Sequence, residues 1–239
     1  MDRRTWLAAL AGLAAGAPAV ARDAGSTARY GRVAPSPDGI GKTFMGREIA
    51  SVMGWQAAGW LERPERETEE DVERMVASLG LVAGQRVADV GAGTGYVARK
   101  LARAVGPSGR VFAVDVQPEM IALLRDLALK ERLAQVEPVL GTAMETKLGA
   151  ASVDLALLVD VYHELEQPFE VLASVVRAVR PGGRVVFVEY RAGEPAVPIK
   201  PLHTMAVEQV RREAEVHGLR FERVDSSLPW QHVVTFRKR

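Results

Sequence analysis

Short apolar runs alternate with amphipathic helical patterns along most of this chain. The apolar runs that predict buried strands are Arg86–Val90, Arg110–Val114, Val136–Leu140, Leu155–Val159 and Arg184–Val188. The helical patterns among them are Tyr96–Val105, Pro118–Leu129 and Phe169–Val179. Strands that alternate with helices in this way predict a parallel sheet with helices on both faces.

The pattern changes near the end of the chain. A predicted helix, Thr204–His217, is followed by two strands, Arg220–Val224 and Gln231–Phe236, with only a turn between them. Two strands joined without a helix form an antiparallel hairpin. We therefore expect an α/β fold with a seven-stranded, mostly parallel sheet that ends in a C-terminal antiparallel hairpin.

The first predicted strand leads into a turn that has glycine at every second position, Gly91, Gly93 and Gly95, and this turn opens a helix. Glycine lets the backbone approach a ligand closely and adopt dihedral angles that a side chain forbids. The next strand ends at Asp115, 24 residues after Gly91, where an acid is placed to hydrogen-bond a ribose diol. The two features together predict a site for a nucleoside-containing cofactor.

The order of the glycines distinguishes between cofactors. Dinucleotide-binding turns use G-x-G-x-x-G, whose helix N-terminus receives a pyrophosphate, whereas this turn is G-x-G-x-G and follows Asp89. An acid there is badly placed for a pyrophosphate but can bind an ammonium group. The stretch resembles the first motif of class I S-adenosylmethionine (SAM)-dependent methyltransferases, (V/L)-(L/V)-D-x-G-x-G-x-G, and the resemblance covers roughly Val72 to Lys238. It implies the Rossmann-like methyltransferase sheet, SAM as the cofactor and methyl transfer to a small-molecule acceptor.

The resemblance also implies which residues bind the cofactor. In that family the acid at the position of Asp115 holds the ribose hydroxyls, and a Gly-Asp-Ala segment after the third strand contacts the adenine. This chain has Thr142 in place of the Asp of that Gly-Asp-Ala segment. The residues expected at the cofactor are Asp89, Gly91, Ala92, Gly93, Gly95, Tyr96, Asp115, Val116, Thr142, Ala143, Met144 and Asp160.

The segment from Asp160 to Leu165 follows the fourth strand, at the edge where open α/β sheets bind ligands. Methyl transfer is an in-line displacement that needs alignment, and an acceptor that must lose a proton also needs a base. A histidine with a near-neutral pKa suits that role. We expect His163 to be this base and Glu164 to orient it or to bind the acceptor; the alternative is that His163 packs near the cofactor. Further candidates to face the acceptor are Glu189, Tyr190 and His203.

Other chemistries lack their sequence signatures. The four histidines are scattered and there is no cysteine, so no set of His, Cys, Asp or Glu has metal-ligand spacing and we expect no metal site. The G-x-S-x-G elbow of a serine hydrolase is absent from the sequence. The near balance of 31 Lys and Arg against 30 acids disfavours nucleic acid as a partner.

The first 21 residues resemble an export signal. Arg3 and Arg4 precede a short apolar run, and an A-x-A cleavage site ends at Ala21. The paired arginines resemble a twin-arginine signal, which implies a periplasmic protein without stable membrane insertion after cleavage.

Two further segments complete the expected organisation. Residues 22–64 are predicted to form a linker and a lid-like segment, whose tryptophans either close over the site or cap the core on a pair of short helices. Residues 65–239 are predicted to form the methyltransferase domain. The charge run that starts at Glu65 predicts the solvated face of a helix that ends near Leu79.

Two alternatives from other classes remain open on these residues. An NAD-dependent oxidoreductase on a Rossmann sheet is disfavoured by the glycine spacing, by Asp89 and by the terminal hairpin. A non-catalytic exported ligand-binding protein would follow if export separated this fold from SAM, which is made in the cytoplasm.

Overall fold

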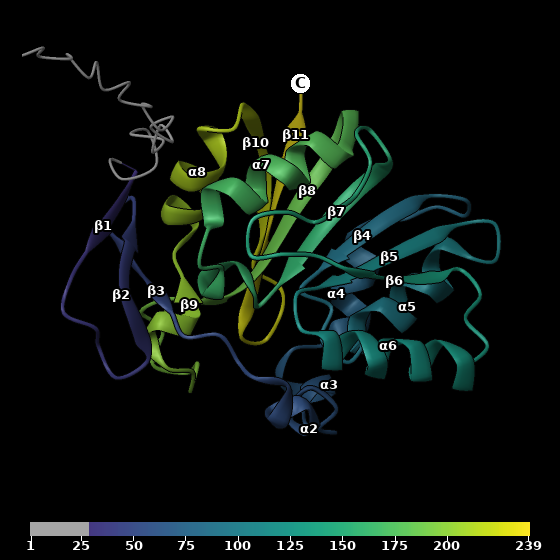
Figure 1. The fold of residues 1–239 in the computed structure, drawn as a ribbon, viewed down its shortest axis with the longest axis horizontal. Helices are drawn as coiled ribbons and strands as arrows, with labels where there is room; N and C mark the ends of the chain where they lie inside the picture. The colour runs from purple at the N-terminus through teal and green to yellow at the C-terminus, as the bar shows by residue number, and fades with distance from the viewer. Residues whose placement is uncertain (1–28) are drawn as a thin grey trace, which may run out of the picture.

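A central sheet with the strand order β10-β11-β8-β7-β4-β5-β6 organises the protein in the computed structural model, which describes residues 29–239 (Figure 1). Its strands are β4 (Arg86–Val90), β5 (Arg110–Asp115), β6 (Val136–Leu140), β7 (Val153–Val159), β8 (Val179–Arg191), β10 (Leu219–Asp225) and β11 (Gln231–Lys238). Strands β4 to β8 run parallel, and β11 inserts antiparallel between β8 and β10. The expected α/β sheet with a C-terminal antiparallel hairpin is confirmed.

Helices cover both faces of this sheet. The helices are α4 (Val72–Ser78), α5 (Tyr96–Val105), α6 (Pro118–Lys130), α7 (Pro168–Ala178) and α8 (Val207–Glu215). Residues of α4, α5 and α6 share one hydrophobic core, and residues of α7 and α8 share the other. Alternate residues of the central strands supply the two cores, since Leu157 belongs to the first and Leu158 to the second.

Several element boundaries differ from the sequence prediction, and two of them bear on the site. Strand β8 begins at Val179 rather than at Arg184 and so includes the Pro181-Gly182-Gly183 segment. Helix α8 begins at Val207, because Thr204 and Met205 form a short strand, β9 (Thr204–Met205), that pairs parallel with β8. This pairing carries the preceding loop to the carboxyl end of β8.

The N-terminal segment, defined here as residues 29–64, contains a separate three-stranded antiparallel sheet. Its strands are β1 (Tyr30–Arg32), β2 (Gly39–Phe44) and β3 (Arg47–Ala50). The linker predicted for Asp23 to Gly41 is therefore wrong where this range forms β1 and the start of β2. Short helices follow, η1 (Trp55–Ala57) and α2 (Ala58–Leu61), as one of the two sequence interpretations expected, but Trp55 and Trp60 on them are exposed and do not cap the core.

The charge run after this segment is a solvated helix face only in part, because Glu67 and Glu73 are exposed but Arg66 and Glu70 are buried. It forms α3 (Arg66–Glu69), which is separated from α4 by Asp71 in the left-handed region at φ 47°. Arg66 and Glu70 are only 5% and 1% exposed and form an ion pair of 2.7 Å. Arg63 also pairs with Glu70, at 2.9 Å. The sequence pattern indicated solvated charges because only folding brings Arg63, Arg66 and Glu70 together as ion pairs.

A buried ion pair holds the small sheet against the main domain. Nε of Arg47 on β3 lies 2.9 Å from Oε1 of Glu213 on α8, and Nη2 lies 2.9 Å from Oε2. Nη1 of Arg47 also donates to the carbonyl of His163 at 3.1 Å. A bidentate pair of this kind fixes orientation as well as position. It therefore places the N-terminal segment over the carboxyl ends of the central strands.

Replacement of Arg47 tests this anchor. Arg47→Ala leaves the Glu213 carboxylate buried without its cation, and we expect the free energy of unfolding to fall by about 3–5 kcal/mol in urea denaturation. The exposed pair between Arg211 and Glu215, at 3.4 Å, supplies the control. Arg211→Ala should cost less than about 1 kcal/mol, and similar losses in the two variants would contradict the anchoring role.

Candidate active site

A cavity of about 1380 Å³ opens at the carboxyl ends of the parallel strands. Its walls come from both the central sheet and the N-terminal segment, including Ile40 and Lys42 of β2 and Trp60 and Leu61 of α2. This edge of an open α/β sheet is the usual ligand position. The N-terminal segment therefore forms one wall of the site rather than a separate appendage.

The glycine turn after β4 forms the floor of this cavity. The amides of Gly91 and Ala92 both donate to the carbonyl of Val114 on β5, at 2.8 and 3.0 Å. Gly91 has φ 75°, and a Cβ atom there would lie 2.3 Å from Cγ2 of Val161. Only glycine fits such a turn without displacing its neighbours. Backbone atoms, rather than a side chain, therefore border the cavity at Gly91.

Asp115 at the end of β5 connects with this turn directly. One carboxylate oxygen accepts a hydrogen bond from the amide of Gly93 at 2.9 Å, and the other accepts one from the amide of Gln117 at 2.9 Å. Burial raises the pKa of Asp115, and the backbone donors oppose that shift. Each oxygen keeps a second lone pair, so the carboxylate can still accept hydrogen bonds from a ligand in the cavity.

Asp89 lies two residues before the turn, within β4, and does not line the cavity. Its side chain is buried, and Oδ2 has no hydrogen-bond partner among the described residues. Burial raises the pKa of Asp89 to about 7; the Arg66 guanidinium opposes this shift and the Asp115 carboxylate adds to it. The expected contact of Asp89 with an ammonium group stays a prediction.

The other residues expected at the cofactor divide into two groups. Those that line the cavity with Gly91, Gly93 and Asp115 are Val116, Thr142, Ala143 and Asp160. Those that do not line it are Ala92, Gly95, Tyr96 and Met144. Tyr96 instead packs in the core, with the guanidinium of Arg66 4.4 Å from its ring centre, and its hydroxyl bonds to Glu67.

Asp160 has an unusual environment for an acid. Its backbone is in the left-handed region at φ 49°, which is uncommon for a residue with a side chain. Gln231 donates to Oδ2 at 2.5 Å, whereas the buried Oδ1 has no partner among the described residues. Burial raises the pKa of Asp160 well above its ordinary value, and the nearby acids Glu70 and Glu189 add to the shift. An unpartnered buried oxygen at the cavity wall is a candidate for ligand binding.

His163 does not have the environment expected of a neutral base. The residue is 1% exposed, and Nδ1 lies 2.6 Å from Oε2 of Glu189 on β8. Although burial opposes it, the charge of Glu189 together with Glu164 raises the pKa of His163 to about 10. The expectation of a near-neutral pKa is therefore wrong. Glu189 rather than Glu164 holds Nδ1, because the end of β8 lies directly behind η2 (Tyr162–Glu164).

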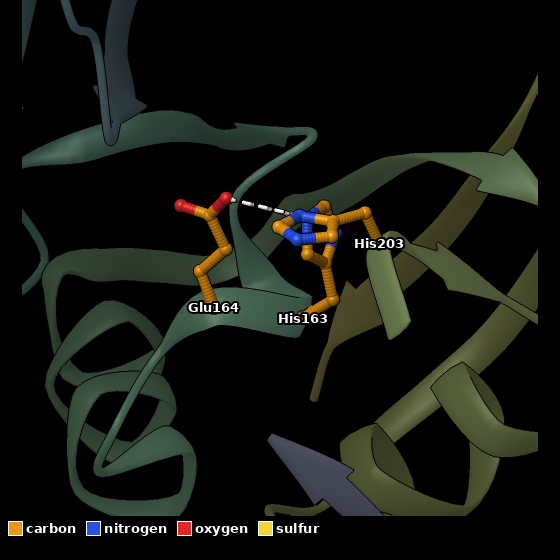
Figure 2. A group of neighbouring side chains, drawn as sticks. All are labelled: His163, Glu164 and His203. Carbon is orange, nitrogen blue, oxygen red and sulfur yellow. Dashed lines mark hydrogen bonds and ion pairs between the residues drawn. The ribbon is translucent and has the colours of Figure 1, made fainter. Parts of the chain in front are cut away.

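Folding brings together three side chains that could hold a metal ion, a grouping that the sequence spacing did not indicate. His163, Glu164 and His203 bring one ligand atom each to a common point, with all three atoms within 4.8 Å of one another (Figure 2). His203 ends η3 (Pro201–His203), in the loop that β9 carries to the end of β8. Sequence spacing could not show the set because His203 is 40 residues from His163.

The cavity also contains charged residues that the sequence did not identify as site residues. Arg63, Arg66 and Glu70 line it from the side of α3. The hydroxyl of Tyr190 on β8 donates to Glu70 at 3.0 Å, which joins this cluster to the strand ends. Their only sequence signal was the charge run, and nothing in that run marks which charges are buried.

Comparison with known proteins agrees with this geometry. Residues 88–187 match the family described as methyltransferase domain. A solved SAM-dependent methyltransferase from Aquifex aeolicus superposes with a TM-score of 0.75 at 26% identity, over 79% of this chain and 100% of that one.

Two curated relatives match over shorter lengths. The ubiquinone/menaquinone biosynthesis C-methyltransferase UbiE of Pseudomonas putida is 31% identical over 112 residues, which is 46% of this chain and 44% of the relative. An uncharacterized methyltransferase of Mycobacterium tuberculosis is 40% identical over 106 residues, 44% of this chain and 40% of the relative. The chain thus spans less than half the length of these relatives.

Residues 88–187 thus match a methyltransferase domain, and the described fold is that of a class I SAM-dependent methyltransferase, a class whose cofactor is SAM. The residues present fit it: a glycine floor that a Cβ would fill, and carboxylate oxygens with unused lone pairs at the cavity. The sheet order, with β11 between β8 and β10, differs from the dinucleotide-binding order. Fold and comparisons thus favour SAM over NAD.

The raised pKa of Asp89 has a measurable consequence for stability. Between pH 4 and 7 the folded protein retains a proton on Asp89 that the unfolded chain has released, so stability falls as pH rises through this window. In Asp89→Asn this contribution disappears, and the decline in the free energy of unfolding should lessen by up to about 1.4 kcal/mol per pH unit. Urea denaturation across this pH range measures the slope.

The control for this experiment is the exposed Asp126 of α6. Asp126→Asn should keep the slope of the wild-type protein. An unchanged slope in Asp89→Asn would show that the Asp89 pKa is not raised.

Proposed function

We propose that this protein transfers a methyl group from SAM to a small-molecule acceptor held in the same cavity. The observation that carries this proposal is the cavity itself, which joins the glycine turn and Asp115 to the cluster around His163. Its volume of about 1380 Å³ exceeds the roughly 300–1,000 Å³ of ordinary ligand pockets. There is thus room for a cofactor and an acceptor side by side.

The cofactor would lie against the glycine floor. The backbone at Gly91 and Gly93 would border its methionine part, and Asp115 would accept hydrogen bonds from the ribose hydroxyls. Val116, Thr142 and Ala143 would border the adenine. The Thr142 hydroxyl oxygen already accepts from the amides of Met144 and Glu145, at 3.3 and 3.0 Å, so the hydroxyl proton is what it offers to a ligand. Bound SAM would supply an electrophilic methyl group on its sulfonium.

The acceptor would occupy the part of the cavity beneath the N-terminal segment. The wall there combines apolar side chains, such as Ile40 and Ile199, with the stem of Lys42. Lys42 donates to the carbonyl of Glu166 at 2.7 Å, which ties β2 to the loop after η2. We propose that this segment is lid-like, because it closes the cavity without belonging to the central sheet. Alignment and exclusion of water are the main contributions that methyl transfer needs from such a wall.

We also propose that the protein is exported to the periplasm. The support is the twin-arginine-like pattern at residues 1–21, which lies outside the described residues. Within residues 29–239, no helix combines the length and apolarity needed to cross a membrane. A route that transports folded protein would allow SAM to travel in its site.

Cofactor binding tests the proposed activity. Titration calorimetry of the full-length protein with S-adenosylhomocysteine, the demethylated product of SAM, should show binding. Asp115→Ala should weaken it at least about 10-fold, because charged hydrogen bonds to the ribose are lost. The exposed Asp126→Ala serves as a matched control and should bind like wild type.

Circular dichroism establishes that each variant is folded. Failure of the folded wild-type protein to bind would contradict the proposal and favour the non-catalytic ligand-binding alternative.

Export is tested separately. In a bacterial host with a twin-arginine system, the wild-type chain should be recovered shortened in the periplasmic fraction. Replacement of Arg3 and Arg4 by lysine should keep it in the cytoplasm. Equal distribution of the two proteins would contradict the twin-arginine route.

A further inference from the structure

We infer that His163, Glu164 and His203 form a binding site for one divalent transition-metal ion of the zinc type, on the acceptor side of the cavity. Each residue directs one atom toward the other two: Nε2 of His163, Oε1 of Glu164 and Nδ1 of His203. In Figure 2 the carboxylate of Glu164 faces the two rings, which come from separate loops.

The spacing of these three atoms matches tetrahedral coordination. Nε2 of His163 lies 3.2 Å from Nδ1 of His203, Oε1 of Glu164 lies 3.2 Å from the same Nδ1, and it lies 3.7 Å from Nε2. Ligand atoms at about 2.0–2.1 Å from a tetrahedral zinc ion are separated by about 3.3–3.4 Å. The three atoms therefore enclose a point at coordination distance from each.

The orientation of the rings agrees with the same centre. The ring centroids of His163 and His203 are 5.0 Å apart and the planes cross at 77°. Two imidazoles on one tetrahedral ion, each with its centre about 3.2 Å from the metal, would have centres about 5 Å apart. The two histidine rings therefore already have the separation that a shared tetrahedral ion requires.

Hydrogen bonds from behind hold two of the ligands. Oε2 of Glu189 lies 2.6 Å from Nδ1 of His163, and the amide of Met53 donates to Oε2 of Glu164 at 3.1 Å. A carboxylate behind a ligating histidine fixes the tautomer that presents its lone pair to the metal. The pairing of Glu189 with His163 has the form of such a support.

Without a metal, the cluster is held by protons: the raised pKa of His163 keeps its ring protonated, and both rings can donate to Glu164. A metal ion at this point would displace the protons from Nε2 of His163 and Nδ1 of His203. A divalent cation would satisfy all three at once. Two imidazole nitrogens and one carboxylate oxygen suit zinc and similar metals rather than magnesium or calcium, which prefer oxygen ligands.

Three protein ligands leave one position of a tetrahedral ion open, the arrangement of catalytic rather than structural zinc sites. His163, Glu164 and His203 all line the cavity, so the open position faces it. Provided that the proposed methyl transfer is correct, this position would bind the oxygen or sulfur atom of a hydroxyl or thiol acceptor. A metal there favours the deprotonated form of such a group.

Zinc binding tests this site on the full-length protein. After chelator treatment, titration calorimetry with zinc chloride should show one ion per chain. His203→Ala and Glu164→Gln should each weaken binding at least about 10-fold, since each loses one of three ligands. The matched controls, His217→Ala and Glu166→Gln, remove the same side-chain types outside the cluster and should bind zinc as wild type does.

Cobalt and the cofactor product give independent readouts. Cobalt(II) should show the visible absorption of a tetrahedral site in the wild-type protein and lose it in His203→Ala, whose side chain is partly exposed and whose fold circular dichroism can check. The inference would be overturned if the wild-type protein did not bind zinc. It would also be overturned if folded His203→Ala and Glu164→Gln bound zinc as tightly as the wild type does. Binding of S-adenosylhomocysteine in the same samples separates the two proposals, because it tests the cofactor site independently of the metal.

Discussion

The site depends on how four acidic side chains are accommodated at one edge of the sheet. Asp89, Asp115, Asp160 and Glu189 lie at or near the carboxyl ends of β4, β5, β7 and β8, which are neighbours in the sheet. Removal of an ionised carboxylate from water is costly unless it is paired or hydrogen-bonded. The compensating groups are the guanidinium of Arg66, the amides of Gly93 and Gln117, the amide side chain of Gln231 and the ring of His163. The glycine turn and η2 meet at this edge of the sheet, where their amides and the His163 ring supply hydrogen bonds to these buried carboxylates.

The N-terminal segment completes the site through similar interactions. Arg47 joins β3 to α8 through Glu213, and Met53 donates to Glu164. A surface that belongs to no central strand thus becomes a wall of the cavity. In the proposed function, the edge of the central sheet supplies the cofactor part of the cavity, and the N-terminal segment with the loops after β7 and β8 supplies the acceptor part. Loops vary more freely than the elements they connect, so the acceptor half is where specificity would arise.

Prediction from the sequence succeeded where the signal is local. The strand limits of β4 and β6 and the helix limits of α5 follow from apolar periodicity, because each element buries one face against its neighbours. The spacing also predicted that Asp115 and the glycine turn share one site, although the hydrogen bond between Gly93 and Asp115 was seen only in the structure. Prediction failed for β1 to β3, because short polar strands on a small sheet lack a periodic apolar face. It also failed for Arg66 and Glu70, whose burial depends on partners that folding supplies.

The sequence by itself determined the class of fold and placed the glycine turn and Asp115 at one edge of the sheet, since both follow from elements adjacent in the chain. Only the tertiary structure decided which side chains surround His163. His163 has a raised pKa because Glu189 approaches it from another strand, and His203 joins Glu164 because β9 pairs with β8. Convergence of residues distant in the chain is set by strand pairing and by burial. Neither strand pairing nor burial produces a residue spacing from which these contacts could be predicted.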